Sequence, residues 1–214
     1  HHLHDVGFDA RAVTAGAYDR DADGYAAATA AMPDPNRAAV TRFVAELGPD
    51  ARVLEIGTGS GRDAAALEAA GASVRRTDVT AGFVERLRAA GHEADLVDPL
   101  VGDLADPASP GRAYDGVWAN ACLHHVDRSR LTAVLGRLAA ATRPGGVLRL
   151  SVKEGDGESW STHGTVSGAR LFTFWREAPL RAALDRAGWE VGEVTHEHGA
   201  TRDEPWLDVV AVRR

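Results

Sequence analysis

The stretch VLEIGTGSG, residues 53–61, runs from an apolar segment into three glycines spaced two residues apart. The apolar residues at 52–56 predict a buried strand, and the alanine-rich residues 64–70 predict a helix after the glycines. Glycines at such a junction let the backbone turn tightly and approach a ligand without a Cβ in the way. The start of the next helix offers unpaired N–H groups to an anionic group. The stretch therefore predicts a strand, a ligand-binding loop and a helix.

Outside this unit, apolar segments with strand and helix character alternate along the chain. Strands are predicted at 52–56, 72–77, 93–97, 115–119, 147–152, 189–195 and 207–212, and helices at 64–70, 80–90, 130–142 and 178–187. This alternation predicts an α/β fold with a Rossmann-like, doubly wound, seven-stranded sheet that is mostly parallel and has helices on both faces. The last two strands have no helix between them, so they should pair antiparallel. Residues 155–169 are polar and predicted to be irregular.

The length of 214 residues suits one α/β domain. Residues 1–10, which open with three histidines in four positions, are interpreted as a tag remnant or a disordered terminus. Residues 11–214 are predicted to form a single domain. Its first part, 11–45, is interrupted by Pro33-Asp34-Pro35 and predicted to form helices that cover the site.

Composition narrows the classes of partner and compartment. The formal net charge of −7 disfavours a nucleic-acid partner, because an acidic surface gains nothing from a phosphate backbone. Cys122 is the only cysteine, and no apolar run reaches the roughly 18 residues that span a bilayer. We expect a cytoplasmic monomer or homodimer without a membrane segment. His196 and His198 alternate on one strand without a third plausible ligand, so no metal site is predicted.

The spacing of the glycines separates two kinds of nucleotide-binding loop. A dinucleotide loop of the form G-x-G-x-x-G that began at Gly57 would need glycine at position 62, where this chain has Arg62. Glycine instead stands at position 61, and Glu55 precedes the loop. This pattern resembles motif I of the class I S-adenosylmethionine-dependent methyltransferases. Asp78, at the end of the second predicted strand, can accept hydrogen bonds from both hydroxyls of a ribose.

Further motifs extend the resemblance over nearly the whole chain. Tyr18 and Tyr25 belong to a Y-D-x-x-A-x-x-Y pattern that is similar to the opening of small-molecule members. The segments YDGVWA at 114–119, LHHV at 123–126, RPGG at 143–146 and FTFW at 172–175 resemble later motifs in the same order. The resemblance implies methyl transfer from S-adenosylmethionine to a small-molecule acceptor, with an oxygen or nitrogen nucleophile expected and S-adenosylhomocysteine as product.

The resemblance also implies which residues bind the cofactor. Those expected to line its methionyl and ribose part are Gly57, Thr58, Gly59 and Gly61, with Glu55 orienting the loop, Asp78 and Val79 at the ribose, and Tyr18 and Tyr25 over the methionine end. Arg62 either pairs with the cofactor carboxylate or is a solvated arginine. The adenine should meet Asp98 and Pro99, or alternatively Asp103 and Leu104; Asp98 is favoured because it lies closer behind the strand. Ala119 and Asn120 are expected under the sulfonium.

Catalytic and acceptor-binding residues follow from position and chemistry. His124 and His125 come after the fourth strand, at the edge where ligands of open α/β sheets bind, and one of them is predicted to act as general base. Lys153, Glu158, Arg170 and Trp175 are predicted to contact the acceptor, since they leave the fifth strand or follow it in a polar segment. Two alternatives remain: a nicotinamide-dependent oxidoreductase, and a non-catalytic protein that binds S-adenosylmethionine.

Overall fold

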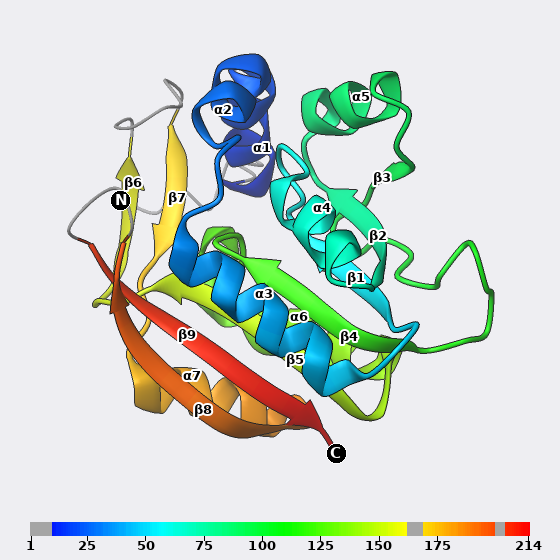
Figure 1. The fold of residues 1–214 in the computed structure, drawn as a ribbon. Helices are drawn as coiled ribbons and strands as arrows, with labels where there is room; N and C mark the ends of the chain where they lie inside the picture. The colour runs from blue at the N-terminus through cyan, green and yellow to red at the C-terminus, as the bar shows by residue number, and fades with distance from the viewer. Residues whose placement is uncertain (1–9, 162–168, 200–203) are drawn as a thin grey trace.

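The computed structural model describes residues 10–161, 169–199 and 204–214. Its main feature is a seven-stranded sheet in the order β3-β2-β1-β4-β5-β9-β8 (Figure 1). Strands β1 to β5 are parallel, whereas β9 is antiparallel to both of its neighbours. The strands span β1 Arg52–Ile56, β2 Ser73–Asp78, β3 Ala94–Leu96, β4 Tyr114–Asn120, β5 Thr142–Lys153, β8 Trp189–His198 and β9 Pro205–Arg213.

Helices cover both faces of this sheet. Figure 1 shows α3 and α4 in front of the sheet and α6 and α7 behind it. The helices span α1 Ala10–Arg20, α2 Ala22–Ala28, α3 Asp34–Leu47, α4 Arg62–Ala69, α5 Ala81–Ala89, α6 Leu131–Ala141 and α7 Glu177–Arg186. Two short 3-10 helices, η2 Leu123–His125 and η3 Arg128–Arg130, connect β4 to α6. The predicted doubly wound fold is confirmed, including the antiparallel pairing of the last two strands.

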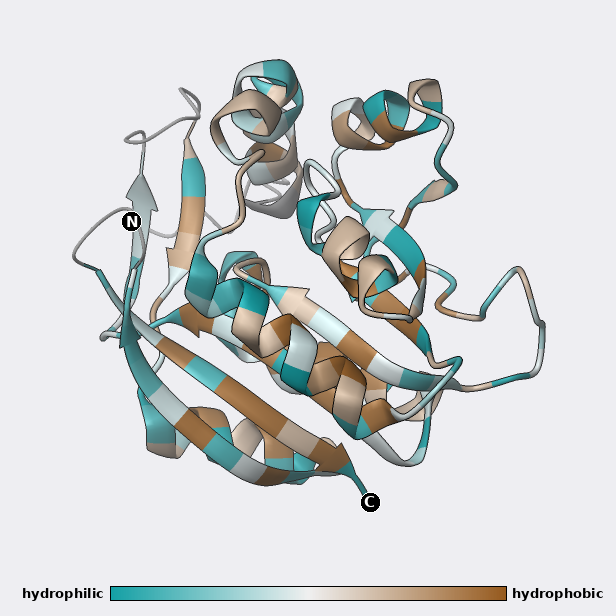
Figure 2. Cartoon of the chain, in the orientation of Figure 1, coloured by the Kyte–Doolittle hydropathy of each residue, from teal (hydrophilic) through white to brown (hydrophobic). Residues whose placement is uncertain are grey.

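Strand β1 shows why the central strands are apolar on both sides. Val53 packs in the cluster that includes residues of α3 and α4, whereas Leu54 packs in the cluster that includes residues of α6 and α7. Successive side chains of a strand point to opposite faces, so a strand covered on both faces is a continuous apolar run. Figure 2 shows the resulting hydrophobic colour along the central strands. For the central strands, the apolar runs in the sequence therefore indicate where each strand lies.

A second sheet, of two strands, was missed. Strand β6 (Glu158–Ser161) pairs antiparallel with β7 (Arg170–Thr173), and β6 lies within the stretch predicted to be irregular. The side chains of β6 are exposed or half-buried, so the segment lacks the apolar alternation that marks a half-buried strand. Its pairing depends on β7, whose four residues are buried. The prediction was wrong because pairing with the next strand, rather than a local apolar pattern, determines β6.

The N-terminal helices divide into two roles. Helices α1 and α2 lie over the carboxyl edge of the sheet, as predicted, and contact α5 and β7. Helix α3, expected as part of the same cover, instead packs on the sheet, since Val40, Phe43 and Leu47 join the core cluster that includes Val53. The predicted tag remnant lies outside the described residues, apart from Ala10. Among the residues described, no helix has the length and apolarity to cross a membrane.

Candidate active site

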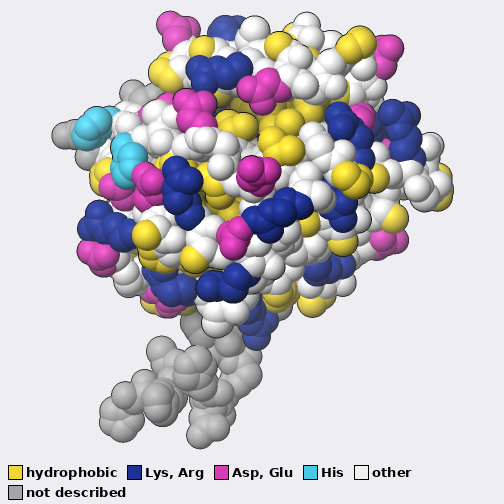
Figure 3. Space-filling view, turned by 90° about the horizontal axis from the view of Figure 1, so that it is seen from below, with side chains coloured by type: hydrophobic (Ala, Val, Ile, Leu, Met, Phe, Trp, Pro, Cys, Tyr) yellow, Lys and Arg dark blue, Asp and Glu magenta, His cyan; other side chains and the backbone are white. Residues whose placement is uncertain are grey.

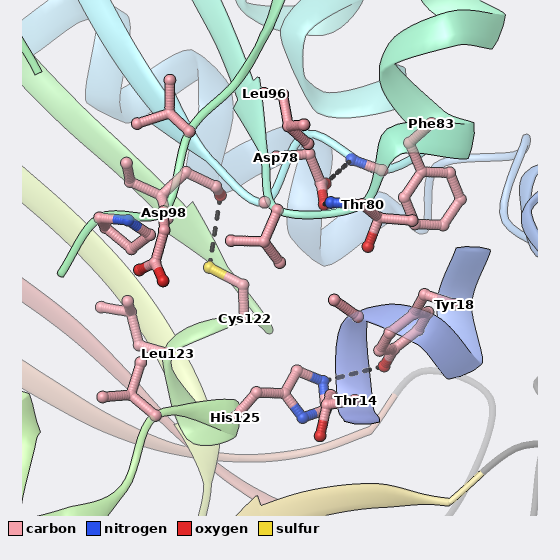
Figure 4. A pocket seen from close by; sticks show the side chains of 18 of the residues that line it. Thr14, Tyr18, Asp78, Thr80, Phe83, Leu96, Asp98, Cys122, Leu123 and His125 are labelled. Atoms are coloured by element: carbon pink, nitrogen blue, oxygen red, sulfur yellow. Dashed lines mark hydrogen bonds between the residues drawn. The ribbon is translucent and has the colours of Figure 1, made fainter. Parts of the chain in front are cut away.

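A cavity of about 320 Å³ opens at the carboxyl ends of the parallel strands, beneath α1 and α2 (Figure 4). Its wall is formed by one face of α1, the glycine loop (residues 57–61) and the segments that follow β2, β3 and β4. Ligands of open α/β sheets bind at this edge, and small-molecule sites measure about 300–1,000 Å³. The cavity therefore has the place and the size of a cofactor site.

The glycine loop turns through the left-handed region, where side chains are disfavoured. The φ angles of Gly57, Gly59 and Gly61 are 69°, 55° and 81°. Gly57 and Gly59 line the cavity. A Cβ on Gly57 would lie 2.5 Å from the Cβ of Cys122, so only glycine fits between the two strand ends. A Cβ on Gly61 would lie 2.7 Å from Leu87 Cδ2, so this third glycine allows the loop to pack on α5 rather than opening the cavity.

Asp78 joins the glycine loop to the end of β2. Its Oδ2 accepts the Gly59 N–H (2.9 Å) and its Oδ1 accepts the Thr80 N–H (3.0 Å). Burial raises the pKa of this carboxyl group to about 6, while hydrogen bonds from Gly59 and Thr80 oppose the shift. The carboxylate lies in the cavity wall, where its remaining lone pairs can accept the hydroxyls of a ribose.

Glu55 lies beneath the loop rather than in the cavity. Its side chain is buried, and its Oε1 has no hydrogen-bond partner among the described residues. Burial, followed by the negative charge of Asp63, raises the pKa of Glu55 to about 8. The glutamate is therefore a neutral acid at neutral pH, a form that costs less to bury than a carboxylate. This placement fits the expected role of orienting the loop without touching a ligand.

The segment after β3 brings Asp98 and Pro99 to the cavity wall. The Asp98 Oδ1 accepts the Leu100 N–H (2.9 Å), which holds the turn. The alternative, Asp103, is exposed and its Oδ1 accepts the Ala105 N–H on the surface loop. Val79, Leu96 and Pro99 add apolar wall beside Asp98. The geometry thus favours Asp98 for the adenine, and its contact with the cofactor stays a prediction.

Several residues predicted to touch the cofactor have other partners. Thr58 is buried, and its N–H donates to the Thr77 carbonyl oxygen (2.9 Å). Arg62 is neither solvated nor aimed at the cavity: it bonds the Thr29 and Ala31 carbonyl oxygens and the Asp63 carboxylate, which ties α4 to the segment after α2. These contacts correct the expectation of a solvated Arg62, and its pairing with the cofactor carboxylate stays a prediction. The carbonyl partners of its guanidinium lie about 30 residues earlier in the chain, so the sequence around Arg62 does not indicate them.

The residues under the predicted sulfonium position also need correction. Ala119 is fully buried in the sheet. Asn120 donates to Asp63 Oδ2 (2.9 Å) and accepts from Arg149 Nη1 (2.9 Å), so it belongs to a polar network below the cavity. The next two residues, Ala121 and Cys122, form the wall instead. Strand β4 ends at Asn120, one residue beyond its predicted end. Because side chains alternate between the two faces along a strand, this shift changes which residues face the cavity.

Tyr18 and Tyr25 both lie in the wall, where their rings meet edge to face at 5.4 Å, and their contact with the cofactor stays a prediction. The Tyr18 hydroxyl is 2.9 Å from His125 Nε2, and His125 also lines the cavity. Burial, more than the charges of Arg170 and Lys153, lowers the pKa of His125 to about 4, while the hydrogen bond that His125 donates to the Leu171 carbonyl oxygen opposes this shift. Of the two histidines, His125 is therefore the one placed to act on a bound molecule.

His124 faces away from the cavity. Its ring is buried and packs on Phe172 (5.1 Å) and Trp206 (5.5 Å). Burial holds its pKa well below the ordinary value, with further lowering by His125 and by the Lys153 and Arg170 charges. Adjacent residues of a short helix point in different directions, so only one histidine can face the site. The prediction of His124 as base is corrected to a packing role.

The four predicted acceptor residues lie behind this wall rather than in it. Lys153 Nζ lies 4.0 Å from the Phe172 ring centroid and 3.4 Å from Glu204 Oε2. Glu158 is exposed on β6, and Trp175 is buried in the core with the Arg128 guanidinium 4.4 Å from its ring centroid. Arg170, which is buried, comes closest to the site, 5.6 Å from the Tyr18 ring centroid. None of the four lines the cavity formed by the described residues, and their contact with the acceptor stays a prediction.

Sequence reasoning missed part of the wall. Thr14, Phe83, Ala121 and Cys122 line the cavity without belonging to a recognised motif. Ala121 has a φ of 55°, a rare conformation for a residue other than glycine, which directs Cys122 into the cavity. The Cys122 thiol donates to the Ile56 carbonyl oxygen (3.3 Å), and burial raises its pKa. The position of Cys122 directly after the fourth strand was the available signal.

The sequence of the chain matches a known family. The sequence model of the methyltransferase domain family covers residues 28–194, well over half of the chain. No curated protein sequence matches the chain significantly.

Solved structures share the fold at low identity. The 1,6-didemethyltoxoflavin-N1-methyltransferase of Burkholderia thailandensis, with bound 1,6-didemethyltoxoflavin and S-adenosylhomocysteine, has 24% identity and a TM-score of 0.70 over 98% of this chain and 92% of that chain. The magnesium protoporphyrin IX methyltransferase of Synechocystis PCC 6803, with bound S-adenosylmethionine, has 18% identity and a TM-score of 0.69 over 98% of this chain and 100% of that chain. The [4+2]-cyclase SpnF has 19% identity and a TM-score of 0.65 over 95% and 96%.

The likeness to these structures shows a shared fold, and the cyclase among them shows that the fold alone does not specify the reaction. The family match specifies more, because it extends over the glycine loop, Asp78 and the segment after β4. With the family shown, the nicotinamide alternative is set aside. The chain belongs to the methyltransferase domain family and is a class I S-adenosylmethionine-dependent methyltransferase.

Proposed function

We propose that this methyltransferase acts on an oxygen or nitrogen atom of a small molecule. The observation that carries the proposal is the covered cavity, with Asp78 in one part of its wall and Tyr18 and His125 in another. A cavity beneath two helices suits a small acceptor better than a polymer. His125, the histidine at the cavity, is neutral at neutral pH because its pKa is about 4. A neutral imidazole has a lone pair that can take up a proton, either directly or through the Tyr18 hydroxyl to which it is hydrogen-bonded.

For the cofactor, we propose contacts with the parts of the wall that fit it. Gly57 and Gly59 expose backbone towards the methionyl and ribose part, Asp78 accepts the ribose hydroxyls, and Asp98 lies at the adenine. Bound S-adenosylmethionine supplies an activated methyl carbon. The residues of the chain then have to align the acceptor with that carbon, exclude water and accept a proton.

Charge supports the small-molecule class over nucleic acid. The net charge is −7, and Figure 3 shows basic and acidic side chains interspersed on the face seen from below rather than gathered by sign. A nucleic-acid site needs a basic surface along the phosphate backbone.

We also propose a reducing compartment such as the cytoplasm, because the only cysteine of the chain is a free, half-buried thiol.

The test has a binding step and a turnover step. Calorimetry with S-adenosylmethionine and S-adenosylhomocysteine should show binding in the micromolar range or tighter. Methyl-labelled S-adenosylmethionine is then incubated with panels of phenols, alcohols, amines and thiols. Label on a hydroxyl or amine supports the proposal. Binding followed by label only on carbon or sulfur would overturn the acceptor assignment, and binding without turnover of any panel member would favour a non-catalytic cofactor-binding protein.

A further inference from the structure

Tyr18 of α1 and His125 of η2 meet at the cavity wall although 107 residues separate them in the sequence. The Tyr18 hydroxyl lies 2.9 Å from His125 Nε2, and the two rings are 5.3 Å apart, edge to face. Figure 4 shows the pair joined by this hydrogen bond, on the opposite side of the cavity from Asp78. Both side chains line the cavity. The pair is thus in reach of a bound molecule.

The direction of this hydrogen bond follows from the other nitrogen of the imidazole. His125 Nδ1 lies 2.6 Å from the Leu171 carbonyl oxygen. A carbonyl oxygen can only accept, so Nδ1 carries the proton of the neutral ring and Nε2 has the lone pair. The Tyr18 hydroxyl must therefore donate to Nε2. Both nitrogens of His125 are engaged. The oxygen of Tyr18, a residue of the cavity wall, also has a side-chain hydrogen bond with Arg170 and has a second lone pair that can accept a proton.

Burial and the surrounding charges keep His125 and Tyr18 uncharged at neutral pH. Burial and the positive charges of Arg170 and Lys153 oppose protonation of His125. Burial raises the pKa of Tyr18, with small contributions from Asp78 and Cys122, while the Arg170 guanidinium opposes the shift. That guanidinium, 5.6 Å from the Tyr18 ring centroid, also stabilises negative charge that develops on the Tyr18 oxygen. The pair therefore starts as a neutral phenol and a neutral imidazole.

We propose that the oxygen of Tyr18, rather than His125, receives the proton of the methyl acceptor, and that the two residues form a proton relay that selects an O–H or N–H nucleophile. This inference rests on the proposed function. The acceptor atom bonds to the methyl carbon as the carbon–sulfur bond breaks and its electron pair stays on sulfur. The acceptor proton passes to the Tyr18 oxygen, and the Tyr18 proton passes to His125 Nε2. His125 later returns a proton to Tyr18, which releases one to water.

The first experiment tests, without any acceptor, whether the Tyr18 hydroxyl donates its proton to His125 Nε2. Long-range ¹H–¹⁵N spectra of the full chain, labelled at histidine and saturated with S-adenosylhomocysteine, should show the His125 proton on Nδ1. In Tyr18→Phe, the Nε2 signal should move to that of an imidazole nitrogen without a hydrogen bond, while Tyr25→Phe should leave it in place. A proton on Nε2 in the wild type, or no response to Tyr18→Phe, would overturn the relay even if methyl transfer occurs.

The second experiment tests catalysis with whichever panel acceptor is methylated. Tyr18→Phe should lower kcat by about a hundredfold, the scale of general-base catalysis, while the affinity for S-adenosylhomocysteine changes by about threefold or less. The solvent deuterium isotope effect on kcat should shrink in the variant, a response that a purely structural role does not produce. An unchanged kcat of Tyr18→Phe with an O–H or N–H acceptor would contradict the relay. Failure of the proposed function would appear instead in the wild type, as label only on carbon or sulfur or as the absence of turnover.

Discussion

The two walls of the cavity are built in different ways. The cofactor wall, residues 57–61 with Asp78 and Asp98, comes from loops that follow neighbouring strands of the sheet. The relay wall consists of Tyr18 and His125, with the Leu171 carbonyl behind His125. These groups come from a helix, a 3-10 helix and a strand of the second sheet. The first wall is therefore set by the core of the fold, and the second depends on how separate segments dock.

This difference has an energetic side. The glycine loop and Asp78, which form most of the cofactor wall, follow strands β1 and β2, whose residues are almost all buried, so we expect this part of the wall to be as stable as the core. Helix α1 is held by individual contacts, among them the Leu171 N–H to Thr14 Oγ1 (3.1 Å) and the Gly82 N–H to Asp19 Oδ1 (2.5 Å). Each such hydrogen bond contributes about 1 kcal/mol. The relay wall should therefore open more easily than the cofactor wall.

The largest expected effect is on the cofactor wall, from Gly57→Ala. The added Cβ would meet the Cβ of Cys122 at 2.5 Å, in a conformation with φ of 69°. Affinity for S-adenosylhomocysteine, measured by calorimetry, should fall by about a hundredfold or more, since overpacking costs ~1–3 kcal/mol and positive φ adds to it. Gly71→Ala is the matched control: its φ is 109°, but no described atom lies within 4 Å of the added Cβ. Equal loss of affinity in both variants would contradict the steric argument.

The next effect concerns the buried acid beneath the loop. Because the pKa of Glu55 is raised from 4.5 to about 8, the folded state holds its proton more tightly than the unfolded chain. Its contribution to stability is thus present at low pH and is lost as the pH rises through about 8. Glu55→Gln lacks this dependence.

Relative to wild type, the Glu55→Gln variant should therefore gain stability with pH. Between pH 5 and 7 the difference in free energy of unfolding should change by roughly 3 kcal/mol, or about 1.4 kcal/mol for each pH unit. Urea denaturation at several pH values measures it. Glu46, exposed on α3, provides the control through Glu46→Gln. Parallel pH profiles for wild type and Glu55→Gln would mean that the acid is not held neutral.

A smaller effect is expected at Asp78. Asp78→Asn should weaken binding of S-adenosylhomocysteine by about tenfold, because a charged acceptor makes stronger hydrogen bonds than an amide. In the wild type, affinity should fall below a pH of about 6, where the carboxylate becomes protonated, and the variant should lack this dependence. Calorimetry at pH 5, 6 and 7 tests both points. Asp103→Asn, on the exposed loop, is the control, and an equal change there would remove the special role of Asp78.

The smallest effect falls on the relay wall. Thr14→Val keeps the shape of the side chain but removes the acceptor of the Leu171 N–H. The free energy of unfolding should drop by about 1 kcal/mol. Hydrogen exchange at the Leu171 amide should accelerate more than exchange in β1, because α1 docks through this bond. Unchanged protection of the Leu171 amide would contradict the conclusion that the relay wall opens more easily than the cofactor wall.

Local patterns were sufficient for the centre of the fold. Strand β1 occupies the predicted residues because a strand covered on both faces must be apolar throughout, and α6 follows from the spacing of Leu131, Leu135 and Leu138. Patterns failed where a contact outside the segment, rather than its own residues, decides the structure. Strand β6 pairs with β7 despite its exposed side chains, and Arg62 bonds carbonyl oxygens some 30 residues upstream. Neither contact changes the local apolar pattern, so no sequence window shows it.

The sequence by itself determined the donor side of this enzyme. Backbone turns that need glycine, and an acidic residue at a strand end, are properties of neighbouring positions, so residues 53–61 and Asp78 show them without a structure. Only the tertiary structure decided that His125 faces the cavity while His124 packs on Phe172, and that the Tyr18 hydroxyl donates to His125. Side-chain direction after a strand changes with each residue, and contact across 107 residues depends on the docking of α1.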